Sequence, residues 1–306
     1  MEVAALAGGV GAAKFLKGAV ESFDPEGLTV IGNTGDDAVM YGLHVSPDLD
    51  IVTYTLAGIV DTRGWGVASD TTHALEQLAG YGFDTWFTLG DRDIGTHMAR
   101  TAWLEEGATL SEVADRVRRA LGVRCRILPM TDDRVCTRIV TAGGEVIEFQ
   151  EYFVKNRHSD PVREVKFEGA ASASPAPGVI EAVEAAGRIV VCPSNPLLSI
   201  GPILAIPGIR DALARRRADV VAISPIIAGR ALKGPAAELM PVMGVESSAA
   251  GIAEVYRDFC ATVVIDSSDA ALAGRIERLG VRPVVTSTVM ATPADAARLA
   301  SAVLDL

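Results

Sequence analysis

A chain of 306 residues can bury one large α/β core, and 49% hydrophobic and 22% charged residues are typical of globular proteins. The formal net charge of −11 argues against general nucleic-acid binding, because the phosphate backbone favours a basic protein face. No apolar stretch is long enough for a membrane span and no basic segment precedes the first one, so we expect a cytoplasmic protein with no membrane partner. The four cysteines form no CxxC pair, which favours reduced thiols over a zinc site.

The first forty residues predict a strand–loop–helix–strand unit. Apolar residues 3–7 lead into a glycine-rich turn, a helix is expected over about 12–21, and residues 28–31 form a second strand. Glycines let a backbone approach a ligand closely, and the amides at a helix N-terminus attract anions. We therefore interpret the turn as a nucleotide phosphate site. The residues assigned to it are Gly8, Gly9, Gly11 and Lys14.

Two standard phosphate-binding motifs fit this turn poorly. A Walker A loop requires Gly-Lys-Ser/Thr, whereas this chain has Ala13-Lys14-Phe15. A dinucleotide fingerprint requires a third glycine where Lys14 stands, so Gly9 and Gly11 match it only in part. The turn indicates a nucleotide site of a less familiar type, with a purely structural glycine turn as the alternative.

Paired carboxylates follow the second strand. The turn of residues 32–37 ends in Asp36 and Asp37, and Asp48 and Asp50 form a second pair shortly afterwards. One member of the second pair is explained as the cap of a following helix, which leaves the other free. Mg²⁺ prefers carboxylates together with phosphate oxygens and water. A solvated turn would explain one pair, but two pairs in close succession favour a metal or general-base cluster.

The segment Arg63-Gly64-Trp65-Gly66 places a stiff aromatic side chain between glycines. It is interpreted either as a lid over a planar ligand or as a packed loop. A helix capped by Ser69 or Asp70 is expected to follow and to run to about Ala79.

Residues 86–89 are expected to form a strand that ends at Gly90-Asp91-Arg92-Asp93. Arg92 would then lie at the carboxyl end of a strand, where open α/β sheets place function. Its side chain would either bind a phosphate or pair with a neighbouring aspartate. Helices are expected over residues 94–104 and 110–121.

The second half of the chain resumes the alternation of strands and helices after an insertion at about 136–178. Residues 136–150 alternate around Gly143-Gly144 and predict a β-hairpin within that insertion. Further strands are expected at 125–129, 188–192, 219–223, 262–266 and 283–286, and helices at 246–258, 269–279 and 293–304. This order predicts one domain, residues 1–306, with a doubly wound, largely parallel Rossmann-like sheet and helices on both faces.

Neutral hydrogen-bonding side chains follow the strand at 188–192. Ser194, Asn195 and Ser199 lie in a turn where a phosphate or guanine pocket would need donors. Ordinary turn chemistry explains their composition equally well, but not their placement after a strand.

Nine motifs in chain order carry a resemblance to a known family. They are LAGGVG (6–11), NTGDD (33–37), PDLD (47–50), RGWG (63–66), LGDRD (89–93), LPMTDD (128–133), PSNP (193–196), SIG (199–201) and SPII (224–227). With them the chain resembles the 2-phospho-L-lactate transferases of coenzyme F420 biosynthesis, including the actinobacterial phosphoenolpyruvate transferases.

The resemblance implies a reaction between two small-molecule substrates. The donor is a guanosine diphosphate conjugated to lactate (LPPG) or enolpyruvate (EPPG), and the acceptor is the deazaflavin alcohol Fo. The ribityl hydroxyl of Fo attacks the phosphorus next to the three-carbon acid and releases GMP, with Mg²⁺ as the expected ion and a homodimer as the expected assembly. The form of residues 6–11 favours the enolpyruvyl donor.

The resemblance also assigns residues. Asp50 and Thr88 match positions that contact Fo, although the family often has a lysine where this chain has Thr88; Trp65 and Arg92 complete the expected Fo site. The expected metal ligands are Asp37 and Asp48, with Asp50 beside them as a base that orients the hydroxyl. The expected nucleotide-binding residues are Gly8, Gly9, Gly11, Lys14, Asn33, Ser194, Asn195 and Ser199.

Two other readings of the sequence compete with the transferase. Gluconeogenesis-factor-like regulators share a glycine-rich first loop and an Asp-Asp after the second strand, but bind uridine-diphospho-sugars without catalysis. They lack the combination of residues 47–50 and 89–93 found here. A nicotinamide oxidoreductase is supported only by the partial glycine fingerprint.

Overall fold

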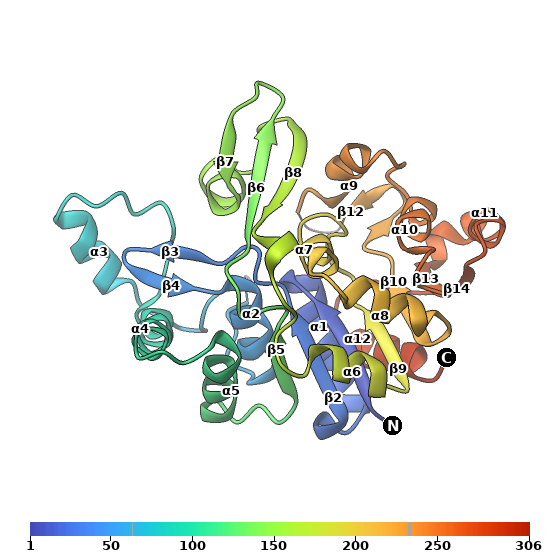
Figure 1. Ribbon diagram of the computed structural model, residues 1–306, viewed down its shortest axis with the longest axis horizontal. Helices are drawn as coiled ribbons and strands as arrows, with labels where there is room; N and C mark the ends of the chain where they lie inside the picture. The colour runs from blue at the N-terminus through green and yellow to red at the C-terminus, as the bar shows by residue number, and fades with distance from the viewer. Residues whose placement is uncertain (63, 232–233) are drawn as a thin grey trace.

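Seven parallel strands form the central sheet of the computed structural model, which describes residues 1–62, 64–231 and 234–306 (Figure 1). Their order across the sheet is β14-β13-β10-β9-β1-β2-β5, and every neighbouring pair is parallel. The strands are β1 (Val3–Ala7), β2 (Leu28–Gly32), β5 (Arg126–Pro129), β9 (Arg188–Val191), β10 (Val220–Ile223), β13 (Thr262–Asp266) and β14 (Arg282–Thr286). The doubly wound parallel fold predicted from the sequence is confirmed. Arg63 of the predicted aromatic loop lies outside the described residues.

Helices surround this sheet. They are α1 (Gly9–Ser22), α2 (Pro47–Leu56), α3 (His73–Gly80), α4 (Asp91–Glu105), α5 (Leu110–Ala120), α6 (Val179–Ala185), α7 (Ile200–Ala205), α8 (Ile209–Arg215), α9 (Ala236–Leu239), α10 (Ala249–Tyr256), α11 (Ala273–Arg278) and α12 (Pro293–Leu304). None of them, within the described residues, has the length and apolar character that a membrane span requires.

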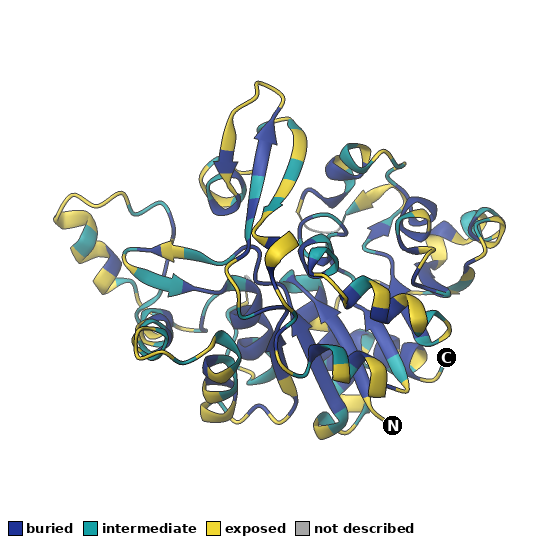
Figure 2. Ribbon diagram, viewed as in Figure 1, coloured by how far each residue is buried: buried dark blue, intermediate teal, exposed yellow. Residues whose placement is uncertain are grey.

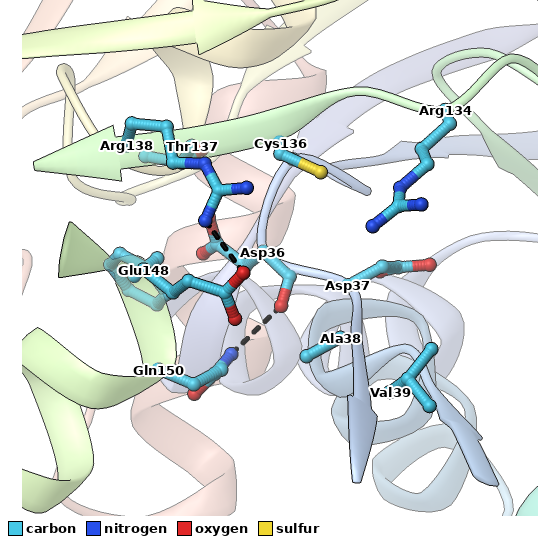
Figure 3. Close-up of a pocket in the computed structure, with 12 residues that line it drawn as sticks. Asp36, Asp37, Ala38, Val39, Arg134, Cys136, Thr137, Arg138, Glu148 and Gln150 are labelled. Atoms are coloured by element: carbon cyan, nitrogen blue, oxygen red, sulfur yellow. Dashed lines mark hydrogen bonds and ion pairs between the residues drawn. The ribbon is translucent and has the colours of Figure 1, made fainter. Parts of the chain in front are cut away.

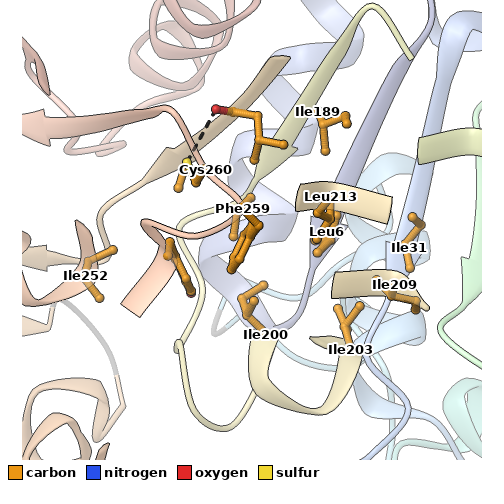
Figure 4. Close-up of a cluster of buried hydrophobic side chains, with 14 of the residues drawn as sticks. Leu6, Ile31, Ile189, Ile200, Ile203, Ile209, Leu213, Ile252, Phe259 and Cys260 are labelled. Carbon is orange, nitrogen blue, oxygen red and sulfur yellow. Dashed lines mark hydrogen bonds between the residues drawn. The ribbon is translucent and has the colours of Figure 1, made fainter. Parts of the chain in front are cut away.

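The central strands are apolar on both faces because helices cover both (Figure 2). Along β1, Leu6 packs into one apolar cluster, and its neighbours Ala5 and Ala7 pack into the other. Helices α6, α7, α8, α10 and α11 complete the first cluster, part of which is shown in Figure 4, and α1, α2 and α12 complete the second. Continuous apolar runs are typical of parallel strands buried in this way. All four cysteines are free thiols, three of them buried.

Three small antiparallel elements extend from the central sheet. The predicted hairpin within residues 136–150 is present as β6 (Cys136–Thr141) and β7 (Val146–Glu148). A third strand that the sequence analysis did not predict, β8 (Val162–Glu168), pairs with β6. The others are the hairpins of β3 (Ala38–Met40) with β4 (Leu43–Val45) and of β11 (Ile226–Ile227) with β12 (Arg230–Ala231).

The strand predicted over residues 86–89 is wrong. Phe87 and Leu89 are buried in a small apolar cluster with β3 and β4, but the segment joins no sheet. Gly90 is the N-cap of α4, so residues 91–93 begin a helix instead of following a strand. The three apolar residues of this segment, Trp86, Phe87 and Leu89, pack locally against β3 and β4. A short apolar pattern alone does not distinguish such a packed segment from a buried strand.

The predicted cap of α3 is also wrong, because two aspartates cap each other's helices. Thr72 is the N-cap of α3. Asp70 instead accepts amides of the first turn of α4, 3.0 Å from Arg92 N, and Asp91 accepts amides of α3, 2.9 Å from Ala74 N. This exchange fixes the N-terminal ends of α3 and α4 side by side.

Helices α1 and α12 cross at Gly18. A Cβ at this position would overlap with the backbone of Ala296 and would lie 2.6 Å from Ala297 N. The helices can therefore touch only because residue 18 has no side chain. Gly95 in α4 offers a contrast, since nothing lies within 4 Å of a Cβ built there.

Gly18→Ala is expected to lower the free energy of unfolding by about 2 kcal/mol, because backbone on both sides of the contact must move. Gly95→Ala is the matched control and is expected to raise it by about 0.5–1 kcal/mol, since alanine favours an open helical position. Urea unfolding of both variants measures the difference. Equal effects of the two substitutions would contradict the close α1–α12 crossing.

Candidate functional site

The candidate site lies at the carboxyl edge of the sheet, where the strand order reverses. There β1 lies between β2 and β9, and later strands add outward on both sides. Open α/β sheets bind ligands at this point because the loops after neighbouring strands diverge. The loops after β1, β2 and β9 carry Gly8, Asn33 and Ser194, and the structure brings them together as the sequence analysis expected.

Asp48 joins the first two of these loops. Helix α2 begins at Pro47 with Ser46 as its N-cap, so Asp48 lies inside the first turn and does not cap it. Its Oδ1 accepts the N–H of Gly9 at 2.8 Å, and its Oδ2 accepts Nδ2 of Asn33 at 2.9 Å. The carboxylate therefore sits at the N-terminus of α1, where a helix attracts an anion.

Two glycines of the first loop are explained by this packing. A Cβ at Gly8 would lie 2.7 Å from Oδ2 of Asp48 and 2.7 Å from Cβ of Ser199. One at Gly11 would overlap with the carbonyl oxygen of Pro193. The close approach of other protein loops thus requires glycine at both positions. Binding of a diphosphate at this turn stays a prediction.

The polar side chains after β9 hold their own loop together. Ser194 Oγ donates to the carbonyl oxygen of Gly8 at 2.8 Å. Asn195 Oδ1 accepts two backbone amides at 2.9 and 3.0 Å, which forms a turn leading into α7. Ser199 is the N-cap residue of α7. Ser194, Asn195 and Ser199 therefore make the contacts of ordinary turn residues. This was the alternative to a phosphate or guanine pocket in the interpretation of the sequence.

The acidic turn after β2 is held by the three-stranded sheet (Figure 3). Thr137 N donates to the carbonyl oxygen of Gly35 at 2.7 Å, and Gln150 Nε2 donates to that of Asp36 at 2.9 Å. A cavity of about 150 Å³ lies beside this turn. Its charged lining residues are Asp36, Asp37, Arg134, Arg138 and Glu148.

Three aspartates at this edge repel one another. Burial, and then the charge of Asp48, raises the pKa of Asp36 well above its usual value. Burial also raises the pKa of Asp37, and a hydrogen bond from Ser46 offsets only part of that effect. The pKa of Asp48 rises to about 6 through burial, against the hydrogen bonds from Asn33 and Gly9. Among the described residues, none of the three aspartates forms an ion pair with lysine or arginine.

This acidic group fits a divalent cation. The Oδ1 atoms of Asp36 and Asp37 are buried without a hydrogen-bond partner in the described structure. Over residues 1–62, 64–231 and 234–306, no three His, Cys, Asp or Glu side chains converge closely enough to enclose an ion. Mg²⁺ commonly takes one or two protein carboxylates and completes its shell with water and substrate phosphates. The acidic group therefore fits an open Mg²⁺ site, in which Asp37 is the most available protein ligand.

Asp50 differs from the other three because an arginine neutralises it. Arg100 of α4 binds both carboxylate oxygens: Nη2 pairs with Oδ1, and Nη1 donates to Oδ2 at 3.1 Å. Both residues are buried, with 3% of Arg100 and 5% of Asp50 exposed. Burial lowers the pKa of Arg100, but the charge and hydrogen bonds of Asp50 outweigh it and raise that pKa overall.

The face of α4 around Arg100 forms a buried polar network with α2. Asp93 Oδ1 accepts the Tyr54 hydroxyl at 2.8 Å and lies 3.3 Å from Nε2 of His97. Burial alone would raise the pKa of Asp93, but the contacts with His97 and Tyr54 and the charge of Arg100 hold it below its usual value. His97 Nδ1 in turn lies 3.0 Å from Nη1 of Arg100.

A second link connects this network to the acidic turn. Ser46 Oγ donates to Oδ2 of Asp37 at 2.6 Å and lies 3.5 Å from Nδ1 of His44. Burial and the charge of Arg100 lower the pKa of His44 to about 4, so its ring is neutral at physiological pH. His44 thus adds no cation to the acidic turn.

Four of the predicted site residues lie further out and are exposed. Lys14 Nζ lies 3.5 Å from the carbonyl oxygen of Met290, near the loop after β14. Thr88 lies in the segment before α4, and Arg92 is in the first turn of that helix. Trp65 is 40% exposed in the loop between Val60 and Val67, which form an isolated bridge. Their contacts with a ligand stay predictions.

The side chains that surround Asp50 were not predicted as site residues from the sequence. A helix was expected over 94–104, with no role for the polar residues at its start and along it. Asp93, His97 and Arg100 recur at intervals of four and three residues, which places them on one helix face. That face is buried against α2, so this spacing was a usable signal. Ser46 and Arg134 gave no comparable pattern.

Comparison with known proteins identifies the family. The sequence profile of the family described as 2-phospho-L-lactate transferase CofD matches residues 3–290. The chain belongs to this family. It is a transferase, and the resemblance read from the nine motifs is confirmed.

Individual relatives cover nearly the whole transferase chain. A phosphoenolpyruvate transferase of Streptomyces coelicolor is 45% identical over 92% of this chain and 90% of its own. A 2-phospho-L-lactate transferase of Methanosarcina mazei is 39% identical over 97% of both chains. A solved structure of a UPF0052 family member from Bacillus halodurans superposes with a TM-score of 0.66 over 99% of this chain and 98% of that one. At 15% sequence identity, that likeness shows the fold alone.

Asp36→Asn is expected to stabilise the transferase at pH 7 in EDTA by about 1–3 kcal/mol, because it removes a buried charge with an unsatisfied oxygen. With its raised pKa, Asp36 binds a proton more tightly in the folded than in the unfolded state. Its ionisation therefore costs stability only as the pH rises above the unfolded value of about 4. Urea unfolding at pH 7 and pH 4 tests this.

The difference between wild type and Asp36→Asn should shrink to well below about 1 kcal/mol at pH 4, where the folded-state carboxyl is protonated and the unfolded one is about half protonated. Glu254→Gln on the exposed face of α10 is the control and should change neither value. A variant that is less stable than wild type at pH 7 would show that the Asp36 carboxylate is not under electrostatic stress.

Proposed function

We propose that the protein transfers a phosphoenolpyruvyl or 2-phospholactyl group from a guanosine-diphosphate conjugate to the ribityl hydroxyl of Fo, in coenzyme F420 biosynthesis. Family membership over residues 3–290 supports the transferase class, and the relatives carry the two donor names. One observation supports the proposal most directly. Four aspartates lie at one edge of the sheet, and they fall into two electrostatic groups. Among the described residues three of them have no lysine or arginine partner, and the fourth is paired with Arg100.

The reaction needs positioning and charge neutralisation more than covalent chemistry. The hydroxyl oxygen of Fo bonds to the phosphorus next to the three-carbon acid, and the bond from that phosphorus to the bridging oxygen breaks. GMP leaves with the electron pair, and Asp50, the proposed base, accepts the hydroxyl proton. Asp37 and Asp48 are the proposed Mg²⁺ ligands, with Asp36 adding negative charge beside them. When bound, the ion would neutralise charge on the phosphates.

Asp50 is the proposed acceptor for the hydroxyl of Fo. It lies near the N-terminal end of α2, two residues from Asp48. In addition to burial, the charge of Asp50 helps to raise the pKa of Asp37, so it lies close to the acidic turn. Trp65, Thr88 and Arg92 are exposed around α4 and remain the proposed contacts for the rest of Fo. Two clusters of charge thus serve two substrates, the acidic turn for the diphosphate and the α2–α4 network for the alcohol.

We assign the three-carbon acid of the donor to Arg134. This guanidinium lines the cavity beside the acidic turn and points toward Asp37 in Figure 3. The cavity's other arginine, Arg138, is occupied by Glu148 and Glu168 at 2.6 and 2.9 Å. Among described residues Arg134 forms no ion pair, so its charge is available to the donor carboxylate.

Arg134→Gln is expected to raise the KM for the donor about 10- to 100-fold, as loss of a charge-assisted hydrogen bond does. The affinity for GDP, which lacks the three-carbon acid, should stay within about twofold. Initial-rate kinetics and calorimetry measure the two quantities. Arg138→Gln is the control in the same cavity. An equal loss of GDP affinity would place Arg134 at the phosphates instead.

Transfer itself is tested by mixing purified protein, Mg²⁺ and Fo with either guanosine conjugate and reading the product mass. We expect the enolpyruvyl donor to be preferred, given the form of residues 6–11 and the 45% identity to a phosphoenolpyruvate transferase. Consumption of neither conjugate, together with binding of a uridine-diphospho-sugar, would support a non-catalytic regulator.

The same assay tests the ion. EDTA should stop turnover and added Mg²⁺ should restore it. Asp37→Asn should raise the Mg²⁺ concentration for half-maximal rate by at least about tenfold, because it removes a ligand charge. Unchanged Mg²⁺ dependence of this variant would exclude Asp37 as a ligand.

A further inference from the structure

The surroundings of Asp50 define a role that extends the proposed function and rests on it. We propose that Arg100 is a positioning residue, which fixes the Asp50 carboxylate as a hydrogen-bond acceptor for the attacking hydroxyl and keeps it out of the metal-binding group. Three features of the contact between α2 and α4 support this role.

The first feature is the geometry of the ion pair. The planar guanidinium of Arg100 engages both oxygens of Asp50, so the carboxylate has one orientation. Each carboxylate oxygen has room for about two hydrogen bonds. After Arg100 has bound, a lone pair on each oxygen is still available to a substrate hydroxyl. The neutralised pair is, however, a weak attractor for a second cation.

The second feature is that Arg100 is itself held in place. Its Nη1 donates to the carbonyl oxygen of His44 at 3.3 Å, and Thr101 Oγ1 accepts the His44 amide at 2.8 Å. These contacts bind β4 to α4. The arginine is therefore held from α2, α4 and β4, and its guanidinium has little freedom to leave Asp50.

The third feature is the histidine behind the arginine. Arginine has donors only, so the 3.0 Å contact between Arg100 Nη1 and His97 Nδ1 requires Nδ1 to accept. The ring proton is then on Nε2, which lies 3.3 Å from Asp93 Oδ1. Asp93 also accepts the hydroxyl of Tyr54, one helical turn beyond Asp50 on α2. The contacts run from α2 through α4 and back to α2, although His97 Nε2 has no aligned hydrogen-bond partner in the described structure.

Kinetics of Arg100→Lys test the positioning role, since lysine keeps the positive charge but cannot bind both carboxylate oxygens as the planar guanidinium does. We expect kcat/KM for Fo to fall about 10- to 100-fold, as a small misplacement of a reacting group does. The KM for the donor and the Mg²⁺ concentration for half-maximal rate should stay within about twofold.

Arg118→Lys is the matched control. Arg118 is a buried arginine on α5 that pairs with Asp115 and donates to the carbonyl oxygen of Val123 at 3.1 Å, away from the site. Thermal unfolding of both variants measures any general loss of stability. If Arg100→Lys loses stability as Arg118→Lys does but keeps its kcat/KM for Fo, Arg100 is structural only and the proposal is overturned.

A second measurement does not depend on turnover. Titration calorimetry with Mg²⁺ alone compares wild type, Arg100→Met and the double variant Arg100→Met/Asp50→Asn. Removing the guanidinium frees a carboxylate, so Arg100→Met should bind Mg²⁺ at least about threefold more tightly, and the added Asp50→Asn should reverse the gain. Equal or weaker binding by a folded Arg100→Met would contradict the exclusion of Asp50 from the metal group. If the wild type does not transfer to Fo, the proposed function is overturned, and the role of Asp50 toward the hydroxyl with it. The Mg²⁺ titration would still decide whether Arg100 keeps Asp50 from binding the ion.

Discussion

Asp48 is the side chain on which the arrangement of the site depends. From the first turn of α2, it accepts hydrogen bonds from the backbone N–H of Gly9, just after the end of β1, and from the side-chain amide of Asn33, just after the end of β2. Three parts of the chain are joined through one buried carboxylate. The glycine at position 8 is required for its approach. Its charge also raises the pKa of Asp36, so the carboxylate that orders the loops also acts as a like charge on a second buried carboxyl group.

The four aspartates of the two sequence pairs end in different electrostatic environments. Asp36, Asp37 and Asp48 are crowded and have no lysine or arginine partner in the described chain, whereas Asp50 faces Arg100. Buried like charges reduce stability, and proteins retain them mainly at functional sites. This division supports separate roles, with the crowded group for a metal and phosphates and the neutralised carboxylate for an alcohol.

The sheet was predictable because its strands are apolar along their whole length and alternate with amphipathic helices. The polar residues at strand ends also located the sheet edge at which the loops carrying Gly8, Asn33 and Ser194 come together. The failures were local. Residues 86–89 form a mostly apolar run that packs beside β3 and β4 without pairing, and β8 was missed because its pattern is largely exposed. Short runs of this kind are decided by neighbours far away in the chain.

The sequence by itself determined the composition and the order of the strands along the chain, since each depends on local pattern. It also determined that two pairs of aspartates, at 36–37 and 48–50, lie close to the ends of predicted elements. The tertiary structure decided which of these aspartates are crowded together without a lysine or arginine partner and which is paired. That choice depends on α4, whose Arg100 is 50 residues from Asp50 and reaches it only because α4 packs across α2. It also decided that Ser194, Asn195 and the first glycines hold loops together, because a hydrogen bond over 186 residues is invisible until the chain is folded.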